Sequence, residues 1–338
     1  MSSLPAGGAG EEEFRKWRKP MLQRMWNFAQ PESKVSLWRA AFMLFAFWLA
    51  CSYRPVLAQQ PGQQTFASAE AAARAFCVAA EAPEQDALLH ILGPDAKDIL
   101  SSGDPVEDLR AREHFLVKYQ EMHRFLKGPN GTVTLIIGAE NWPFPIPLVN
   151  NHGSWYFDTA AGKEEILCRR IGRNEMAAMD ASRDLVQAQQ QYFQYLPANR
   201  KQFARKLLSD NGRHNGLYWQ GTYNEFASPI NPLIAYANGR GAGDQGANPV
   251  PFNGYFFRVL TSQGAHAPGG AENYLVDGKM TAGFAFVAYP AEYRSSGVMT
   301  FIVNESGVIY EKDLGPNTTR IAEAMSAFDP DSTWHRVN

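Results

Sequence analysis

Metal-binding side chains are present in this sequence, but they lack the spacing of a metal site. The seven histidines are scattered, and no two of them stand four residues apart, as they would on one face of a helix. A His-Glu-x-x-His motif is absent, and Cys77 and Cys168 are far apart in the chain. The sequence therefore predicts no metal site and no cofactor.

Carboxylates form two groups that could carry out acid–base chemistry if they were buried in pairs. The groups are Asp104, Glu107, Asp108 and Glu113, and then Asp158, Glu164 and Glu165. Both fall at predicted helix starts or turns, where a cap or a solvated turn accounts for them. The chain has no Gly-x-Ser-x-Gly motif, and the glycines of 239–243 lack the following lysine of a phosphate loop. We predict no catalytic residue.

Aromatic side chains beside proline and glycine are the stronger indication of a site. They are Trp142, Phe144 and Trp155, followed much later by Tyr218 and Trp219. Loops carry binding residues more often than cores do, so these rings could line a groove for a peptide or a glycan. The alternative is that they cover the open face of a sheet.

The first part of the chain predicts helices followed by strands. Ser68 can cap a helix over 69–81, and a shorter helix is expected over 86–92. Asp104 and Pro105 begin a helix whose apolar spacing continues to Gly128. The period then changes to two, and strands are predicted at 132–137, 146–149, 154–158 and 165–168.

The second part predicts a long helix laid on an antiparallel sheet. The helix spans 173–196, and further helices are expected at 201–208, 231–234 and 319–328. Strands are expected at 255–262, 273–276, 281–289, 298–304 and 308–312. Asp277-Gly278 and Ser306-Gly307 are the turn signals. The predicted fold is therefore α+β, with two domains at 66–170 and 171–338, each consisting of helices packed on a small antiparallel sheet.

An apolar run of twelve residues, 40–51, indicates export. It is too short to span a membrane but suits a signal peptide, and Arg39 and Arg54 bound it. We expect a signal peptide over 1–58 with a long basic N-region, cleavage between Ala58 and Gln59, and a linker over 59–65. The alternatives are an acylated Cys51 and an uncleaved anchor. Because the N-region is unusually long, a start codon near Met21 or Met25 is also open.

The net charge and the expected location limit the classes of molecule that could bind the chain. Without residues 1–58 the chain has 24 Lys and Arg against 30 Asp and Glu, so phosphate backbones make poor partners and nucleic acid is not expected. A periplasmic or secreted location follows from export, with membrane contact only through the signal segment before cleavage. An oxidising compartment permits a disulfide between Cys77 and Cys168, and two buried thiols are the alternative.

Several motifs in fixed order resemble the bacterial exported family catalogued as domain of unknown function 2950. The motifs are WPFPIPLV at 142–149, RRIGRNE at 169–175, GLYW at 216–219, VMTFIVN at 298–304 and YEKDLG at 310–315. The resemblance covers nearly all of 66–338. It implies an exported protein and no particular activity.

Two fainter resemblances concern the domains. Asn174-Glu175, Gly254–Phe257 and Gly297–Phe301 are similar to the soluble part of type IV pilins and pseudopilins, although charged residues stand where the apolar half of a pilin helix would be. The first domain resembles nuclear-transport-factor-like domains. Together these features favour a non-enzymatic envelope protein that binds or helps assemble another envelope component: a protein, a peptide or a glycan. The alternatives are a periplasmic hydrolase of cell-wall or polysaccharide material, and a first domain that holds a small ligand.

Overall fold

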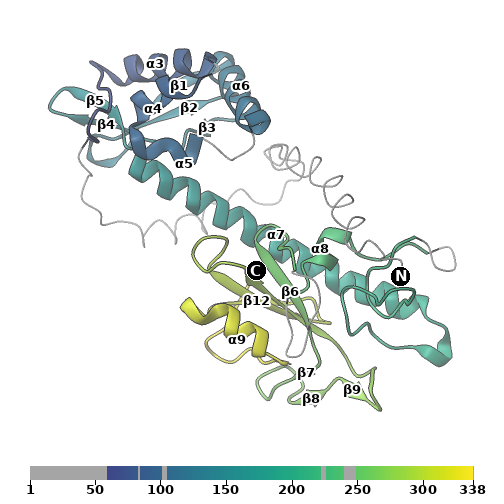
Figure 1. Cartoon of the computed structure of the whole chain (residues 1–338). Coiled ribbons are helices and arrows are strands. Elements are labelled where there is room, and N and C mark those ends of the chain that lie inside the picture. The colour runs from purple at the N-terminus through teal and green to yellow at the C-terminus, as the bar shows by residue number, and fades with distance from the viewer. Residues whose placement is uncertain (1–58, 83, 101–104, 222–225, 240–248, 338) are drawn as a thin grey trace, which may run out of the picture. The chain divides into compact units, whose positions relative to one another are not determined.

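The computed structural model describes residues 59–337, except for 83, 101–104, 222–225 and 240–248 (Figure 1). The chain divides into two compact units between Ile166 and Leu167. The predicted signal peptide, with Cys51 and Ala58, lies outside the described residues, as does Asp104. Within the described ranges, no helix combines the length and the apolar character that crossing a membrane requires.

Helix α3 of unit 1 begins at its predicted cap, and α4 ends at the predicted glycine. Ser68 Oγ accepts a hydrogen bond from the Ala71 amide (3.1 Å) at the start of α3, and Gly93, with a φ of 91°, follows α4. The helices are α3 (Ala69–Glu81), α4 (Asp86–Leu92), α5 (Lys97–Leu100) and α6 (Pro105–Glu121).

Helix α6 ends seven residues before the predicted Gly128. The amide of Gly138 donates to the carbonyls of Lys118 and Met122, which satisfies the last turn of the helix. The chain then forms a strand, β1 (His123–Lys127), that pairs antiparallel with β2 (Val133–Ile137). Helical spacing of the apolar residues therefore continues past the point where the helix stops.

Unit 1 has a five-stranded sheet whose main path is β1-β2-β4-β5, with β3 paired to β2. The remaining bounds are β3 (Trp142–Pro143), β4 (Leu148–Asn151) and β5 (Ser154–Phe157). Its inward side chains join those of the helices in one hydrophobic cluster. Phe76 is central to it, with ring centroids 5.1 Å from both Phe115 and Phe144.

Residues 60–66 belong to unit 1, whereas the sequence predicted a linker over 59–65. Gln63 is 5% exposed, and its Nε2 donates to the carbonyls of Ile91, Leu92 and Phe157. Phe66 exchanges two backbone hydrogen bonds with Trp155. A polar composition suggested a solvated segment, but here the polar side chain pairs with carbonyl groups inside the fold.

Helix α7 (Thr159–Tyr195) starts fourteen residues before the predicted helix. Asp158 Oδ1 accepts a hydrogen bond from the Ala161 amide (3.1 Å) and caps it. The strand predicted at 165–168 is wrong, because these residues are helical. A short apolar run such as Ile166–Cys168 fits both the helical period of 3.6 residues and the strand period of two. The Asp158 cap in front of it favours the helix.

Unit 2 is organised around a five-stranded antiparallel sheet with the order β15-β13-β12-β11-β6. A two-stranded sheet pairs β9 with β10, and a three-stranded sheet has the order β14-β7-β8. The strands are β6 (Tyr255–Leu260), β7 (Ser262–Gln263), β8 (Glu272–Asn273), β9 (Leu275–Val276), β10 (Lys279–Met280), β11 (Ala285–Pro290), β12 (Met299–Asn304), β13 (Ile309–Asp313), β14 (Ala327–Phe328) and β15 (His335–Arg336).

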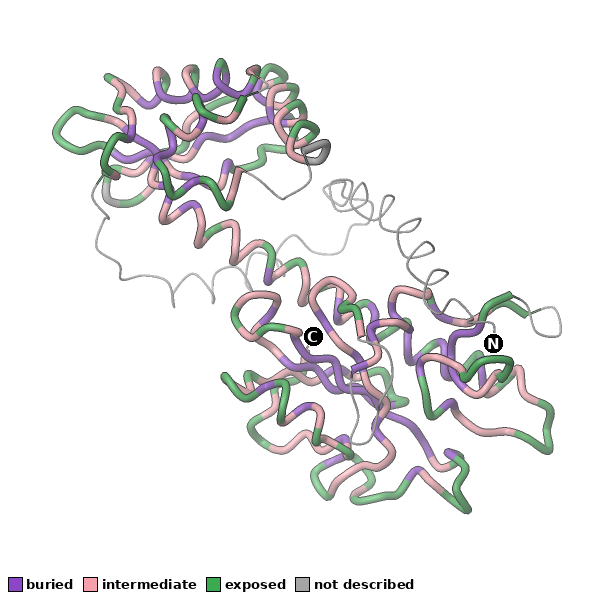
Figure 2. The backbone as a smooth tube through the Cα atoms, in the orientation of Figure 1, coloured by how far each residue is buried: buried purple, intermediate pink, exposed green. Residues whose placement is uncertain are grey.

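The core of unit 2 lies along its central strands. Every residue of β11 is buried, and so are five of the six in β12 (Figure 2). The same cluster takes in α7 side chains such as Leu185 and Tyr192, and Ala322 of α9. The two short helices are α8 (Pro232–Tyr236) and α9 (Thr318–Ala324), so the predicted 319–328 helix ends early and continues into β14.

The predicted helix at 201–208 does not form. Instead, both the amide and the carbonyl of Ala204 bond to the side chain of Gln189, at 2.8 and 2.7 Å. Lys201 Nζ donates to the carbonyls of Phe193 and Gln194 and so completes the end of α7. These bonds use backbone groups that a helix would need. The fold is nevertheless α+β, as predicted, with antiparallel sheets in both units.

Candidate functional site

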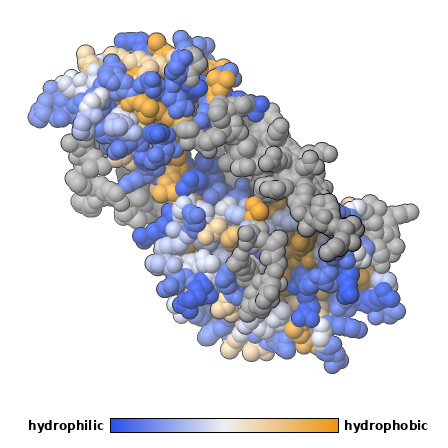
Figure 3. Space-filling model, in the orientation of Figure 1, coloured by the Kyte–Doolittle hydropathy of each residue, from blue (hydrophilic) through white to orange (hydrophobic). Residues whose placement is uncertain are grey.

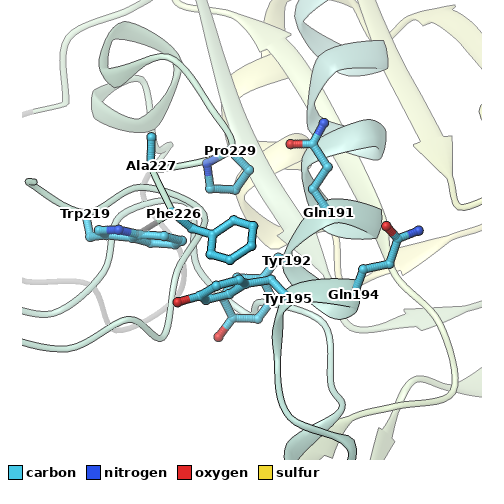
Figure 4. Close-up of a pocket in the computed structure, with 8 residues that line it drawn as sticks. All are labelled: Gln191, Tyr192, Gln194, Tyr195, Trp219, Phe226, Ala227 and Pro229. Atoms are coloured by element: carbon cyan, nitrogen blue, oxygen red, sulfur yellow. The ribbon is translucent and has the colours of Figure 1, made fainter. Parts of the chain in front are cut away.

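A pocket of about 390 Å³ lies in unit 2, between the last turns of α7 and two described parts of the chain, Trp219 and residues 226–229 (Figure 4). It is lined by Gln191, Tyr192, Gln194, Tyr195, Trp219, Phe226, Ala227 and Pro229. Its volume is at the small end of the range for small-molecule sites. None of these eight described residues carries a charge.

Aromatic rings form much of the pocket. The rings of Tyr195 and Trp219 are nearly parallel, 26° apart, with centroids at 6.3 Å, and Phe226 is tilted against Tyr195 at 4.3 Å. Phe226 is 55% exposed, whereas Trp219 is 6% exposed. A phenylalanine with its ring half in water loses hydrophobic stabilisation that a ligand can restore.

Trp219 is held in place by its neighbours in the chain. Its backbone amide donates to Ser228 Oγ (2.7 Å), and His214 packs edge-on against its ring at 5.3 Å. Gly216 permits this path, because a Cβ there would lie 2.7 Å from the backbone of Leu208 and Ser209. The indole Nε1 is buried without a hydrogen-bond partner in the described chain, and such donors are usually satisfied by water or a ligand.

Two glutamines supply the polar groups. Gln191 and Gln194 are both exposed and stand one turn apart on α7. Figure 4 shows their amides on the helix, at one side of the aromatic rings. Each amide has two donors and an acceptor, so it can bond to a hydroxyl or to a peptide group in either direction.

Of the five predicted binding residues, three lie in unit 1. Phe144 is a core residue, 8% exposed, with its ring 5.4 Å from that of Phe115. Trp155 is half-buried against the same core. Trp142 is 36% exposed and lies edge-on to Phe144, and the exposed apolar side chains of this unit also include Val78 and Val117. Figure 3 shows apolar patches of this kind between hydrophilic ones.

The other two predicted residues, Tyr218 and Trp219, lie in unit 2, and Trp219 lines the pocket. Tyr218 is buried, with its ring 6.0 Å from that of Tyr236. The sequence analysis missed Tyr192, Tyr195 and Phe226 in the pocket. The spacing of the two tyrosines and of the two glutamines, three residues apart on one helix, is a signal that could have identified this face.

The carboxylates considered above for acid–base chemistry can be located wherever the structure describes them. Asp158 caps α7, Glu113 and Glu165 are exposed, and Asp108 and Glu164 are half-buried. Neither Asp104 nor the side chain of Glu107 is described.

The sequence analysis missed Glu175 as a buried carboxylate. Its Oε1 accepts the amides of Val298 (2.9 Å) and Met299 (3.0 Å). Burial raises the pKa of Glu175, although the two amides oppose the shift. Burial also raises the pKa of Glu311, and the charge of Glu175 adds to that effect. Glu175 joins α7 to the start of β12.

Among the described residues, the cysteines and the metal-ligating side chains form no further site. Cys77 is buried in α3, Cys168 is half-buried in α7, and these two described residues are not joined by a disulfide. Burial raises the pKa of the Cys77 thiol. Within the described residues, no three His, Cys, Asp or Glu side chains come together to hold a metal ion.

Comparison with known proteins places the chain in a family. No curated protein and no solved structure matches it, so the likenesses to pilins and to nuclear-transport-factor-like domains stay predictions. One family model matches residues 63–337, which include both units and the pocket. The chain therefore belongs to the family described as "Protein of unknown function (DUF2950)".

Proposed function

We propose that the chain is an exported envelope protein that acts by binding, without catalysis, another envelope component in the pocket of unit 2. The observation that carries the proposal is the composition of that pocket. Aromatic rings and neutral amides line it, and its eight lining residues include no His, Asp, Glu or Lys, the side chains that most often carry out acid–base catalysis.

Export is supported by the sequence of residues 1–58, which combines a basic segment, a short apolar run and Val56-Leu57-Ala58. It is tested by expressing the full chain in a bacterial host and fractionating the cells. The expected product is periplasmic or secreted and begins at Gln59. A cytosolic product that retains 40–51 would contradict export.

Binding is tested by immobilising the full chain and washing it with envelope extract that contains cell-wall and polysaccharide fragments. Wild type should retain an extract component, and Phe226→Ala should retain far less. Phe226 is 55% exposed, so its truncation should leave the fold intact. Trp142→Ala, a half-exposed aromatic of unit 1, is the matched control and should behave as wild type.

Two results would contradict the proposal. One is equal retention by wild type and both variants, which would place binding elsewhere. The other is turnover of a cell-wall or polysaccharide polymer by the purified wild type, which would favour the hydrolase.

A further inference from the structure

The pocket of unit 2 opens beside a row of glutamines on α7. Gln187 stands four residues before Gln191, and Gln190 four residues before Gln194. All four side chains are exposed, and residues four apart lie above one another on a helix. We name these four residues the glutamine ladder. It extends the polar side of the pocket by one helical turn, or about 5 Å.

The ladder consists of surface glutamines, unlike its neighbour Gln189. That residue is fully buried, and both ends of its amide bond to Ala204. Gln189 therefore has a structural role, which is to hold the backbone at Ala204. Gln191 and Gln194 line the pocket beside the aromatic rings, Gln187 and Gln190 continue the row by one turn, and none of the four carries a charge.

Resting on the proposed function, we infer that the ligand is an uncharged glycan chain, with one sugar ring in the pocket and the next along the glutamine ladder. The faces of aromatic rings carry a partial negative charge, which attracts the weakly positive C–H groups on a sugar face. Sugar hydroxyls both donate and accept hydrogen bonds, as glutamine amides do. The uncharged lining would leave an acidic or basic polymer without counter-charges.

Peptide ligands fit the surroundings less well. A strand-like peptide needs an open strand edge, and none of the eight lining residues lies in a strand of the described structure. A polyproline peptide would contact the aromatic rings, but its tertiary amides offer only acceptors, so the acceptor oxygens of the ladder would find no donor. A proline peptide is therefore the competing probe.

Calorimetric titration of the full chain tests the inference. The probes are oligomers of glucose and of N-acetylglucosamine, one to six units long, together with deca-proline and oligogalacturonate. Wild type should bind at least one neutral sugar series, and its affinity should rise from one unit to two and then level off. The two other probes should bind at least tenfold more weakly.

Variants assign the binding to the two parts of the surface. The double variant Gln191→Ala with Gln194→Ala should lose roughly tenfold in affinity for every oligomer, as the removal of two hydrogen bonds would cause. Gln187→Ala with Gln190→Ala should leave the shortest binding oligomer unaffected and abolish the gain with length. Gln120→Ala, an exposed glutamine on α6, is the control and should match wild type.

Failure of both neutral series to bind, tighter binding of deca-proline, or affinity independent of the ladder would overturn the inference. If the Phe226-dependent retention from envelope extract persists in those cases, the proposed function stands and only the glycan assignment fails. If that retention is also absent, both fail.

Discussion

Replacing Gln189 by leucine tests how the segment at 201–208 is held. Gln189 and Ala204 are both almost fully buried, and the glutamine amide bonds to the amide and to the carbonyl of Ala204. Leucine fills a similar volume but leaves two backbone groups without partners. Each such group costs about 1–3 kcal/mol, so unit 2 should lose about 2–6 kcal/mol, toward the lower end because leucine adds apolar burial.

That loss is a large share of the stability of an ordinary domain, about 5–15 kcal/mol. A domain of the size of unit 2 loses about 2–4 °C in melting temperature per kcal/mol, so a drop of roughly 5–20 °C is expected. Differential scanning calorimetry of the full chain measures it. Gln190→Leu makes the same change one residue away on the exposed face and should shift melting by no more than about 2 °C. If Gln189→Leu had the same melting temperature as this control, the hydrogen bonds between Gln189 and Ala204 would contribute nothing to stability.

Three further perturbations have expected outcomes. Glu175→Gln keeps an acceptor for the amides of β12 without the charge. Because the pKa of Glu175 is raised in the folded chain, the wild type loses stability as pH rises above about 4. In urea unfolding, the free energy of unfolding of the variant should therefore increase relative to that of the wild type from pH 4 to 7. A difference between the two that does not change with pH would refute this. Gly297→Ala should lower the melting temperature sharply, because its Cβ would overlap the buried Tyr255 ring and hydroxyl; unchanged melting would contradict that contact. Gly172→Ala meets no atom within 4 Å inside α7 and should gain about 0.5–1 kcal/mol, so destabilisation would contradict the open space there.

Local signals predicted the elements that have their own start and stop residues. Ser68 fixed the start of α3, and Asp277-Gly278, both with positive φ, form the turn between β9 and β10. The errors fall where a local pattern fits two structures. Phe125 continues the apolar spacing of α6 but lies in β1, where it pairs with Leu135. Such pairing depends on residues distant in sequence, which periodicity alone does not include.

The candidate site could be predicted only in part. Trp219 was identified from its type and its place beside glycines, but the pocket also needs Tyr195 and Phe226, and their proximity follows from the path of the chain between them. Part of that path, 201–208, was predicted as a helix, but Ala204 bonds to the side chain of Gln189 instead. Aromatic residues in Pro-rich sequence were equally prominent in unit 1, where Phe144 turned out to fill the core.

The hydrogen bond from Gln63 to the carbonyl of Phe157 joins residues 94 apart in the chain. A ribosome delivers Gln63 long before it delivers Phe157. Unit 1 therefore cannot complete its fold while its chain is still emerging. The side-chain amide of Gln63 remains in water until the last strand of the unit is available. The earliest described part to emerge is thus among the last to reach its final partners, and a chaperone or protease present during that interval would meet it first.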